Sequence, residues 1–312
     1  MNSFTKKFSV LTFCLIFLLG MFASVGFTTA PAKVTPDTGA EDIPSIDDST
    51  TPSDGDNKNN PDTPTDSDTD SDKTKNPDID VPARFRSALQ AYNYAMKYLN
   101  NSYGVYTVST GYTTASVATQ EIKGYKKIDK NGNFFSESAS KKTGSIGVNF
   151  AEKSYIPKDE EKVYYKQTSS VNNDLTANYT SNAKTYTFSE YISKFYILPN
   201  ATNYVINKDT IANSRIKYDS SNERYTGSFI LNNDAVEVYK HKIKKSSGSS
   251  TMPVFKSVTL DFVLDKYGRF LTISTSEVCT ATVVLNMTIT TKIKETFKCY
   301  NDEKITIYQG EF

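Results

Sequence analysis

The chain has 312 residues and a formal net charge of +1, and this near-neutral total hides a strong asymmetry. Residues 33–80 carry 14 Asp and Glu against four Lys, whereas residues 1–32 carry two Lys and no acids. By subtraction, residues 81–312 hold 30 Lys and Arg against 21 acids, a net charge of +9. The length allows one or two domains, and a single His argues against histidine-based catalysis or a histidine metal site.

The N-terminus reads as a targeting segment. Lys6 and Lys7 precede an apolar run over residues 8–27, and small residues follow, with Ser24-Val25-Gly26 and Ala30-Pro31-Ala32 as candidate cleavage sites. The run is also just long enough to cross a bilayer if it is not cleaved, with the lysines inside and the domain outside. Cys14 lies within the run, where a lipid-attachment cysteine does not fit. Residues 1–32 are therefore predicted to be a signal peptide or membrane anchor, and the protein to be extracytoplasmic, either secreted or anchored at the cell surface.

Residues 33–80 are predicted to be a disordered acidic linker. They consist mainly of Pro, Asp, Ser, Thr and Asn, and such a segment cannot bury enough apolar surface to offset chain entropy. Asp66, Asp68, Asp70 and Asp72 alternate with Ser and Thr, but a calcium site needs converging ligands and a sharp turn. We therefore interpret the segment as a solvated spacer.

Residues 81–312 are predicted to form a β-rich extracytoplasmic domain. Apolar residues at helical spacing from Phe85 to Leu99 predict a helix over 83–101, with Asp80 as its cap and Pro82 in its first turn. A short helix over 189–195 and a helix over 234–247, capped by Asn232 or Asn233, are also expected. Strands are predicted over 103–112, 117–128, 133–140, 145–150, 162–167, 176–188, 210–218 and 224–231, and Asn131-Gly132 indicates a hairpin turn.

The last third alternates most clearly. Leu260, Phe262, Ile273 and Cys279 lie on one phase, and Thr280, Thr290, Lys292, Lys294 and Lys298 lie on the other. This pattern predicts long antiparallel strands with one apolar face, and the two longer helices are the natural cover for it. The expected fold class is α+β, with a long curved antiparallel meander covered by an N-terminal helix and one or two inserted helices.

This order of elements resembles the LolA/LppX-like envelope proteins. The resemblance rests on the leading helix Phe85–Leu99, the hairpin from Leu260 to Arg269 and the long strands that run to Cys299, and it covers about residues 83–308. It implies a half-barrel with helices in its concavity and a lipid or acyl chain as ligand. Many such proteins are lipoproteins, and this chain departs from them because it has no lipid-attachment cysteine after the apolar run. It also looks similar to secreted proteins of Gram-positive bacteria.

The predicted function is non-catalytic binding of a hydrophobic or amphiphilic ligand of the cell envelope. The residues expected on the apolar inner face, either as ligand contacts or as plain core, are Leu260, Phe262, Ile273, Val283, Ile289 and Phe297. The alternative is a surface domain that binds protein or an anionic wall polymer through its basic face. The candidates are the basic run Lys240–Lys245 and the strand face with Lys292, Lys294 and Lys298. Partners are thus a lipid, a wall polymer, or the membrane through an uncleaved N-terminus; no cofactor, metal or nucleic acid is expected.

Three further features bear on possible chemistry, namely a pair of cysteines, the single histidine and a calcium-loop-like segment. Cys279 and Cys299 permit a disulfide, although a turn at Asn286 would place Cys279 opposite position 293, so two buried thiols are an equal alternative. His241 lies among lysines and is interpreted as a solvated helix residue. The Asp129–Asn133 segment fails the calcium-loop pattern because its glycine is at the fourth position, so we expect a plain hairpin there.

Overall fold

The structure is a computed structural model that describes residues 85–115, 118–144, 149–247, 249–282, 286–307, 310 and 312, without the side chains of residues 246 and 247. The predicted targeting segment (1–32) and linker (33–80) lie outside the described residues. Three helices are present, namely α2 (Ala88–Asn100), α3 (Phe188–Phe195) and α4 (Glu237–Ser247), and a 3₁₀ turn η1 (Asn233–Val236) leads into the last.

The helices occur where the sequence predicted them, but the first begins later. Ser87 is its cap, because the Ser87 side chain accepts a hydrogen bond from the backbone N–H of Gln90 at 3.1 Å. The predicted start at residue 83 is therefore wrong, because the Ser87 side chain caps the helix and its first helical residue is Ala88. α3 has a capping box between Thr187 and Glu190, and Asn232 caps η1 as expected.

Eleven strands form one antiparallel sheet in the spatial order β6-β5-β4-β3-β2-β1-β11-β10-β9-β8-β7. Their bounds are β1 (Val105–Ala115), β2 (Ala118–Ile128), β3 (Phe134–Lys142), β4 (Phe150–Ile156), β5 (Lys162–Thr168), β6 (Lys184–Thr187), β7 (Ile211–Asp219), β8 (Arg224–Leu231), β9 (Val254–Leu264), β10 (Phe270–Thr282) and β11 (Asn286–Cys299).

The sheet consists of two meanders joined at their first and last strands. β1 pairs with β11, so the sheet is continuous although these strands are far apart in sequence. The chain must then travel from β6 at one edge of the sheet to β7 at the other. It does so through α3 and residues 196–210, and this crossing segment places buried side chains such as Leu198 and Tyr204 in the interior. The sequence did not predict this crossing.

One predicted strand is wrong and another is tested only in part. Residues 145–148 of the expected strand 145–150 lie outside the described residues, and the strand of this region, β4, begins at Phe150. Of the expected strand 176–188 only β6 exists, because the chain before it closes on itself through a bridge between Val171 and Ala177, with Leu175 at a φ of 65°. The hairpin at Asn131-Gly132 is confirmed, with Gly132 at a φ of 84°.

Helix α2 packs on one half of the sheet, over β8, β9 and β10. The ring of Tyr92 lies edge-on to three aromatic rings of β8, β9 and β10, with centroid distances of 5.6 Å to Phe229, 5.7 Å to Phe262 and 5.5 Å to Phe270. Phe262 in turn covers Gly227 on the neighbouring strand so closely that a Cβ added there would lie 2.0 Å from the ring. This half of the interior is a closely packed aromatic core.

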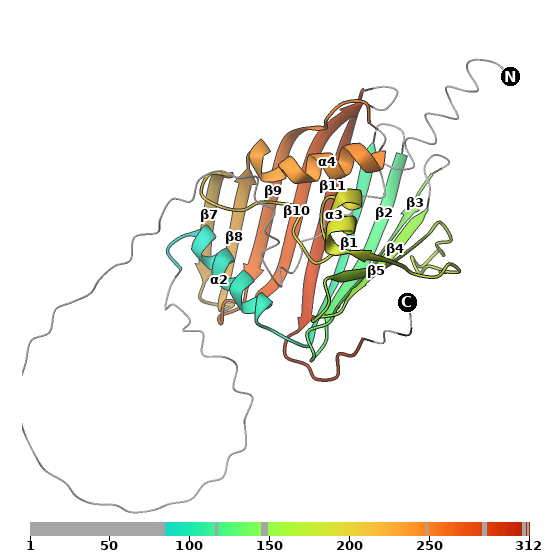
Figure 1. The fold of residues 1–312 in the computed structure, drawn as a ribbon. Coiled ribbons are helices and arrows are strands. Elements are labelled where there is room, and N and C mark those ends of the chain that lie inside the picture. The colour runs from blue at the N-terminus through green and yellow to red at the C-terminus, as the bar shows by residue number, and fades with distance from the viewer. Residues whose placement is uncertain are drawn as a thin grey trace, which may run out of the picture. The chain divides into compact units, whose positions relative to one another are not determined.

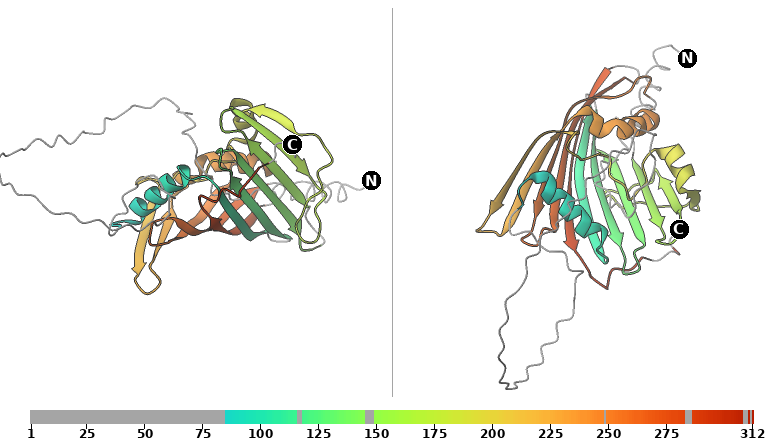
Figure 2. Two further views of the ribbon diagram at one scale, coloured as in Figure 1. Left: turned by 90° about the horizontal axis from the view of Figure 1, so that it is seen from below. Right: turned by 60° about the vertical axis from the view of Figure 1, so that its left-hand side comes forward.

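The sheet bends around its helices, as Figures 1 and 2 show. α2, α3 and α4 all lie on the concave side, and the convex side of the sheet carries none of them. The predicted α+β class and the half-barrel architecture implied by the resemblance are confirmed.

Candidate functional site

The concave face changes character along the sheet. On β8, β9 and β10 the inward side chains are mainly apolar, as in Phe229, Leu260 and Phe262. On β11 and β1–β4 the register brings polar inward residues side by side: Ser109 of β1 lies opposite Glu295 of β11, and Lys126 of β2 lies opposite Ser136 of β3. Hydroxyls and charges on the inner face of a sheet do not contribute the burial energy that holds a domain together.

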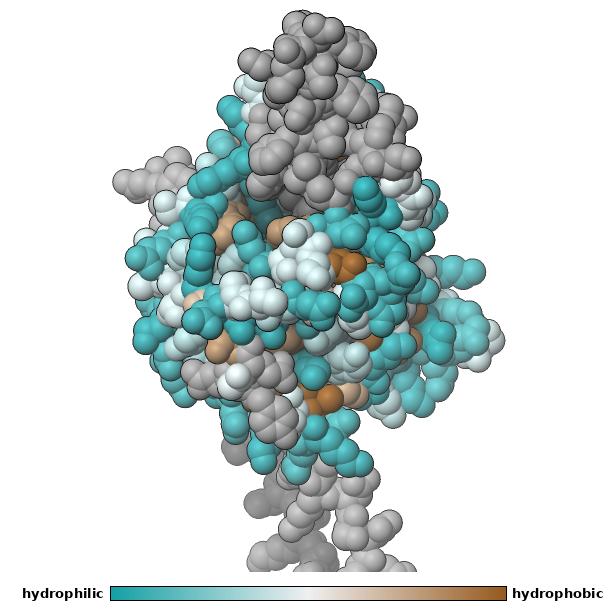
Figure 3. Space-filling view, turned by 90° about the vertical axis from the view of Figure 1, so that its right-hand side faces the viewer, coloured by the Kyte–Doolittle hydropathy of each residue, from teal (hydrophilic) through white to brown (hydrophobic). Residues whose placement is uncertain are grey.

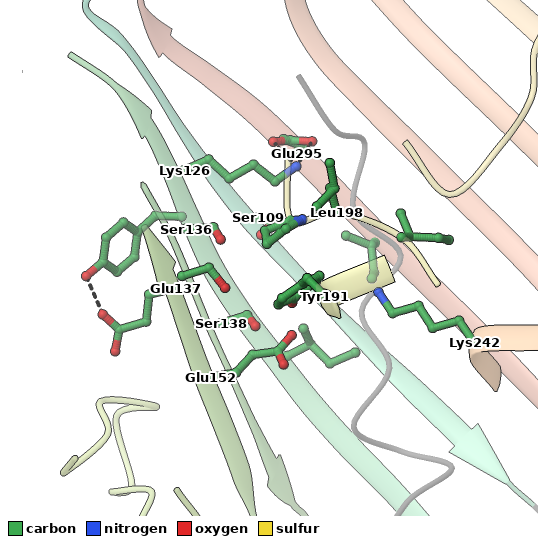
Figure 4. A pocket seen from close by; sticks show the side chains of 16 residues that line it. Ser109, Lys126, Ser136, Glu137, Ser138, Glu152, Tyr191, Leu198, Lys242 and Glu295 are labelled. Carbon is green, nitrogen blue, oxygen red and sulfur yellow. Dashed lines mark hydrogen bonds and ion pairs between the residues drawn. The ribbon is translucent and has the colours of Figure 1, made fainter. Parts of the chain in front are cut away.

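A cavity of about 60 Å³ lies over this polar part of the face (Figure 4). Its floor is formed by inward residues of five adjacent strands, and its roof comes from α3, the crossing segment and α4. The lining residues are Ser109, Ile122, Tyr125, Lys126, Ser136, Glu137, Ser138, Glu152, Ser154, Tyr191, Ile197, Leu198, Pro199, Lys242, Ile293 and Glu295. A space of this size holds only a few water molecules or a small chemical group.

A buried ion pair forms one end of the cavity. The Lys126 ammonium lies 3.1 Å from one carboxylate oxygen of Glu295 and 3.3 Å from the other, and both side chains are less than a tenth exposed. The Thr107 hydroxyl also donates to Glu295 at 2.8 Å. Removing two charges from water costs several kcal/mol, which such contacts offset only in part, so the pair is poor evidence for a purely structural role.

A second pair of opposite charges forms the other end. In Figure 4 the Lys242 side chain extends from α4 and Glu152 rises from β4, with Tyr191 of α3 beside them. Burial raises the pKa of Glu152, while Lys242 and a hydrogen bond of 2.9 Å from the Tyr165 hydroxyl act in the opposite direction. Burial lowers the pKa of Lys242, and Glu152 opposes that shift. Two cations and three carboxylates, the third being Glu137, thus border a space floored by serine hydroxyls, which suits a polar or zwitterionic group.

Beside the cavity, a carboxyl group of β10 is buried among tyrosines. Glu277 is 3% exposed, accepts a hydrogen bond from the Tyr204 hydroxyl of the crossing segment, and lies 3.4 Å from the Tyr239 hydroxyl of α4. Burial raises the pKa of Glu277 to about 7, although both tyrosine hydrogen bonds lower it. Glu277 therefore links the roof of the concave face to its floor through a group that titrates near neutral pH.

This position predicts that the domain loses stability as the pH rises. Because the folded pKa of about 7 exceeds the ordinary 4.5, the stabilising effect of the bound proton is complete below pH 4.5 and is lost as the pH passes 7. The loss should amount to roughly 3 kcal/mol. Urea unfolding at pH 5 and pH 8 measures it, and Glu277→Gln, which stays neutral, should be more stable than the parent chain at pH 8. Equal pH dependence in both chains would show that Glu277 does not titrate in this range.

The residues that the sequence named as ligand contacts lie in the core. Leu260 and Phe262 are fully buried, Ile273 is 1% exposed, and Ile289 and Phe297 are 5% and 7% exposed, all within one apolar cluster. None of these five lines the cavity. Ile273 comes nearest, because it lies opposite Glu295 on the adjacent strand. Val283 lies outside the described residues.

Cys279 and Cys299 are both free thiols, so the disulfide is excluded in this fold. Cys279 lies opposite Ile289, because the turn is centred before Asn286; the predicted pairing with position 293 is wrong. Cys299 lies ten residues farther along β11, which separates the two by about 33 Å. A disulfide requires Cα atoms within about 7 Å.

The two thiols should differ in reactivity. Burial and the nearby Glu277 raise the pKa of Cys279 to about 12, whereas Cys299 is only partly buried, and its pKa is raised by burial and Asp302. Because the thiolate is the reactive form, we expect iodoacetamide at pH 8 to label Cys299 at least about tenfold faster than Cys279. Peptide mapping of the native protein measures both rates. Equal rates would mean that the end of β10 opens readily.

The other sequence features are ordinary parts of the fold. The Asp129 carboxylate accepts from the backbone N–H groups of Asn131 and Asn133, both at 2.9 Å, which is a hairpin turn and not a calcium loop. His241 is 48% exposed on α4 and stacks on Tyr196. The basic run Lys240–Lys245 belongs to α4 on the concave side, whereas Lys292, Lys294 and Lys298 are on the convex side, so the two groups of lysines lie on different faces of the sheet.

The described part of the chain holds neither a cluster of metal-ligand residues nor a membrane-spanning helix. No three His, Cys, Asp or Glu side chains in the described ranges are grouped as metal ligands. Among the helices that the structure describes, none has the length and apolar character needed to cross a membrane.

The sequence missed the polar cavity, although one signal of it was present. On β1 and β3 the inward phase carries Thr107, Ser109, Ser136 and Ser138 where β8 to β10 carry large apolar residues. Strands that are polar on both phases, in the middle of a sheet, indicate that the interior there is not an apolar core. The partners Tyr191 and Lys242 could not be found this way, because only the three-dimensional fold brings their helices over these strands.

Comparison with known proteins gives distant structural likenesses only. No family model matches the chain, and no curated protein matches it. Among solved structures it is similar to LprF from Mycobacterium bovis, with 10% identity over 71% of this chain and 96% of that one and a TM-score of 0.34. It is also similar to MucB in complex with MucA (7% identity, 62% and 89% of the two chains, TM-score 0.11) and to an inactive mutant of the CurK dehydratase (10% identity, 68% and 84%, TM-score 0.14). The fold itself, an eleven-stranded antiparallel half-barrel with helices in its concavity, is established by the chain's own strand pairing.

Proposed function

We propose that the domain is a non-catalytic, extracytoplasmic binding module that holds the polar part of an amphiphilic ligand in the cavity on its concave face. The observation that carries this proposal is the row of serines Ser109, Ser136, Ser138 and Ser154 on the cavity floor, between two oppositely charged pairs. A fold that needed only stability would fill these inward positions with apolar side chains. Hydroxyls and charges placed there favour a polar group that enters from solution.

An apolar wall supports the amphiphilic character of the ligand. Ile122 and Ile293 form a small cluster apart from the main core, and both line the cavity together with Ile197 and Leu198 of the crossing segment. These side chains offer contact to the first carbons of an attached chain. We propose that contacts farther along, toward Ile273 and the other inward core residues, require α2 or the crossing segment to move, because those positions are filled by their own neighbours.

The ligand is expected to be bound and not converted. The only histidine of the chain, His241, is half exposed on α4 and does not line the cavity. The carboxylates of the cavity are held by hydrogen bonds or an ion pair: Glu295 by Lys126 and Thr107, Glu152 by Tyr165, and Glu137 by Tyr125. Groups held in this way orient a ligand by charge and hydrogen bonds.

The proposed location follows from the sequence. Residues 1–32 would export the domain as a signal peptide or hold it as an anchor, and residues 33–80 would act as an acidic spacer. N-terminal sequencing of the protein recovered from cells distinguishes cleavage after position 26 or 32 from an intact anchor.

The test is native mass spectrometry of the full chain after mild extraction. The parent chain should carry an added mass that solvent extraction identifies as an amphiphile, and Ser138→Leu should abolish it by filling the cavity. Ser276→Leu is the matched control, because Ser276 faces outward on β10 and the same change there leaves the cavity intact. Thermal unfolding confirms that both variants are folded.

The proposal is contradicted if the parent chain carries no added mass, or if Ser138→Leu retains it as fully as Ser276→Leu. Each result would place ligand binding elsewhere or remove it.

A further inference from the structure

The convex face of the sheet carries a concentration of lysines, which we call the outer lysine face. It consists of Lys123 and Lys127 on β2, Lys141 on β3, and Lys292, Lys294 and Lys298 on β11. The acids on or beside it are Glu121, Glu137, Asp174 and Asp261, of which Asp261 lies on β9, two strands away from Lys294. The six lysines lie on the side of the sheet away from α2, α3 and α4 and do not line the cavity, although Glu137 borders both.

The strand register fixes the spacing of these lysines. Thr110 of β1 lies between Lys294 on β11 and Lys123 on β2, which places the two ammonium stems two strands, or about 9.6 Å, apart. Lys292 and Lys294 are successive outward residues of β11, about 7 Å apart. The face therefore presents rows of positive charge at intervals of about 7 to 10 Å.

The fold does not neutralise these charges. Lys292, Lys294 and Lys298 are exposed and have no ion-pair partner within the described part of the chain. Two of the nearby acids are engaged by the protein: the Tyr125 hydroxyl donates to Glu137 at 2.5 Å, and Thr176 donates to Asp174 at 2.7 Å. Like charges on one face of a sheet repel each other. Threonine, which is abundant on these strands, would stabilise the sheet equally well, so stability alone does not explain the lysines.

A shallow groove of about 650 Å³ lies on the same face over β1 and β2, and Lys123 is the one of the six lysines that lines it. Thr110, Tyr112, Glu121 and Lys123 line it, and Leu175 of the loop between β5 and β6 stands at one side. That loop is held against the sheet, since the Lys141 ammonium donates to Asn173 at 2.6 Å. Tyr112 is 40% exposed and lies opposite Lys292, so an aromatic ring adjoins the charges.

We propose that the outer lysine face binds a linear polyanion, a polymer with one phosphate or carboxylate per repeat, which lies along this groove. Regularly spaced lysines match repeated negative charges, and the ring of Tyr112 can pack against the polymer's polyol or sugar carbons. A groove on a convex surface suits a chain better than a flat bilayer. Figure 3, which views the molecule from the side of β3 to β5, shows a mainly hydrophilic surface with small scattered apolar patches among the coloured residues.

The experiment measures binding of the full chain to three probes: polyglycerol phosphate, polygalacturonate, and vesicles of phosphatidylglycerol. Both polymers should bind, and binding should weaken as NaCl rises from about 50 to 500 mM, because salt screens exposed charges. Lys123→Gln/Lys294→Gln should weaken polymer binding about five- to tenfold. Preference for one polymer identifies the anionic group.

The matched control is Lys217→Gln/Lys256→Gln, which removes the same charge from exposed positions on β7 and β9. It should change polymer binding less than about twofold. Equal losses in both double variants would mean that net charge alone attracts polymers, and binding to vesicles but to neither polymer would assign the face to a membrane; either result overturns the proposal. Failure of the cavity test above would leave this inference untouched, because none of the six lysines of the outer lysine face lines the cavity.

Discussion

Replacing Tyr92 by alanine should lower the free energy of unfolding by about 3–5 kcal/mol, one of the two largest effects expected in this domain. The Tyr92 side chain is 4% exposed and its ring contacts Phe229, Phe262 and Phe270, each on a different strand. Its loss leaves a cavity between α2 and the sheet that these packed rings cannot close. Urea unfolding followed by tyrosine fluorescence or circular dichroism measures the change.

Tyr92→Phe is the matched control, because it keeps the ring and removes only the hydroxyl. We expect it to cost about 1 kcal/mol. If Tyr92→Ala cost no more than Tyr92→Phe, α2 would not be seated on the aromatic half of the sheet, and the packing described above would be wrong.

Lys126→Met should destabilise the domain by a comparable amount, about 3–5 kcal/mol. The substitution leaves the Glu295 carboxylate 3% exposed and supported only by the Thr107 hydroxyl, as a buried charge without its cation. Urea unfolding of the variant and of the parent chain measures the change.

The companion double variant Lys126→Met/Glu295→Leu should recover most of this loss. Well-packed apolar residues in place of a buried ion pair are often neutral or stabilising by about 1–4 kcal/mol. If the double variant were less stable than Lys126→Met alone, the pair would hold the fold together, and its presence would need no ligand to explain it.

The sequence predicted elements well where one phase of a strand is apolar. The strand over 224–231 was predicted with the bounds of β8, and the strands around Leu260 and Ile273 were predicted with the correct inward phase. Alternation specifies a strand because a shift by one residue would turn its apolar side chains to water. The short helix α3 was predicted to begin one residue late, at 189, because its capping residue Thr187 was assigned to the preceding strand.

The candidate site could not be predicted in the same way. Ser109, Ser138 and Ser154 are each plain strand residues in the sequence, and only the pairing of β1 to β4 brings them to one floor. The pairing of β1 with β11 adds Glu295 from nearly two hundred residues away, at the opposite end of the domain sequence. The apolar residues that the sequence predicted as ligand contacts instead lie in the closely packed half of the interior. Alternation within a strand predicts which side chains point inward, whereas the site depends on which strands and helices lie next to each other.

The claim on which the account depends is that the polar groups of the concave face serve a ligand and not the fold. The most direct test is native mass spectrometry of the Lys126→Met/Glu295→Leu variant after mild extraction, with its folding confirmed by thermal unfolding. We predict a folded protein, at least as stable as the Lys126→Met variant, from which the bound amphiphile carried by the parent chain is absent. A folded double variant that carries the same amphiphile in the same amount would contradict the account.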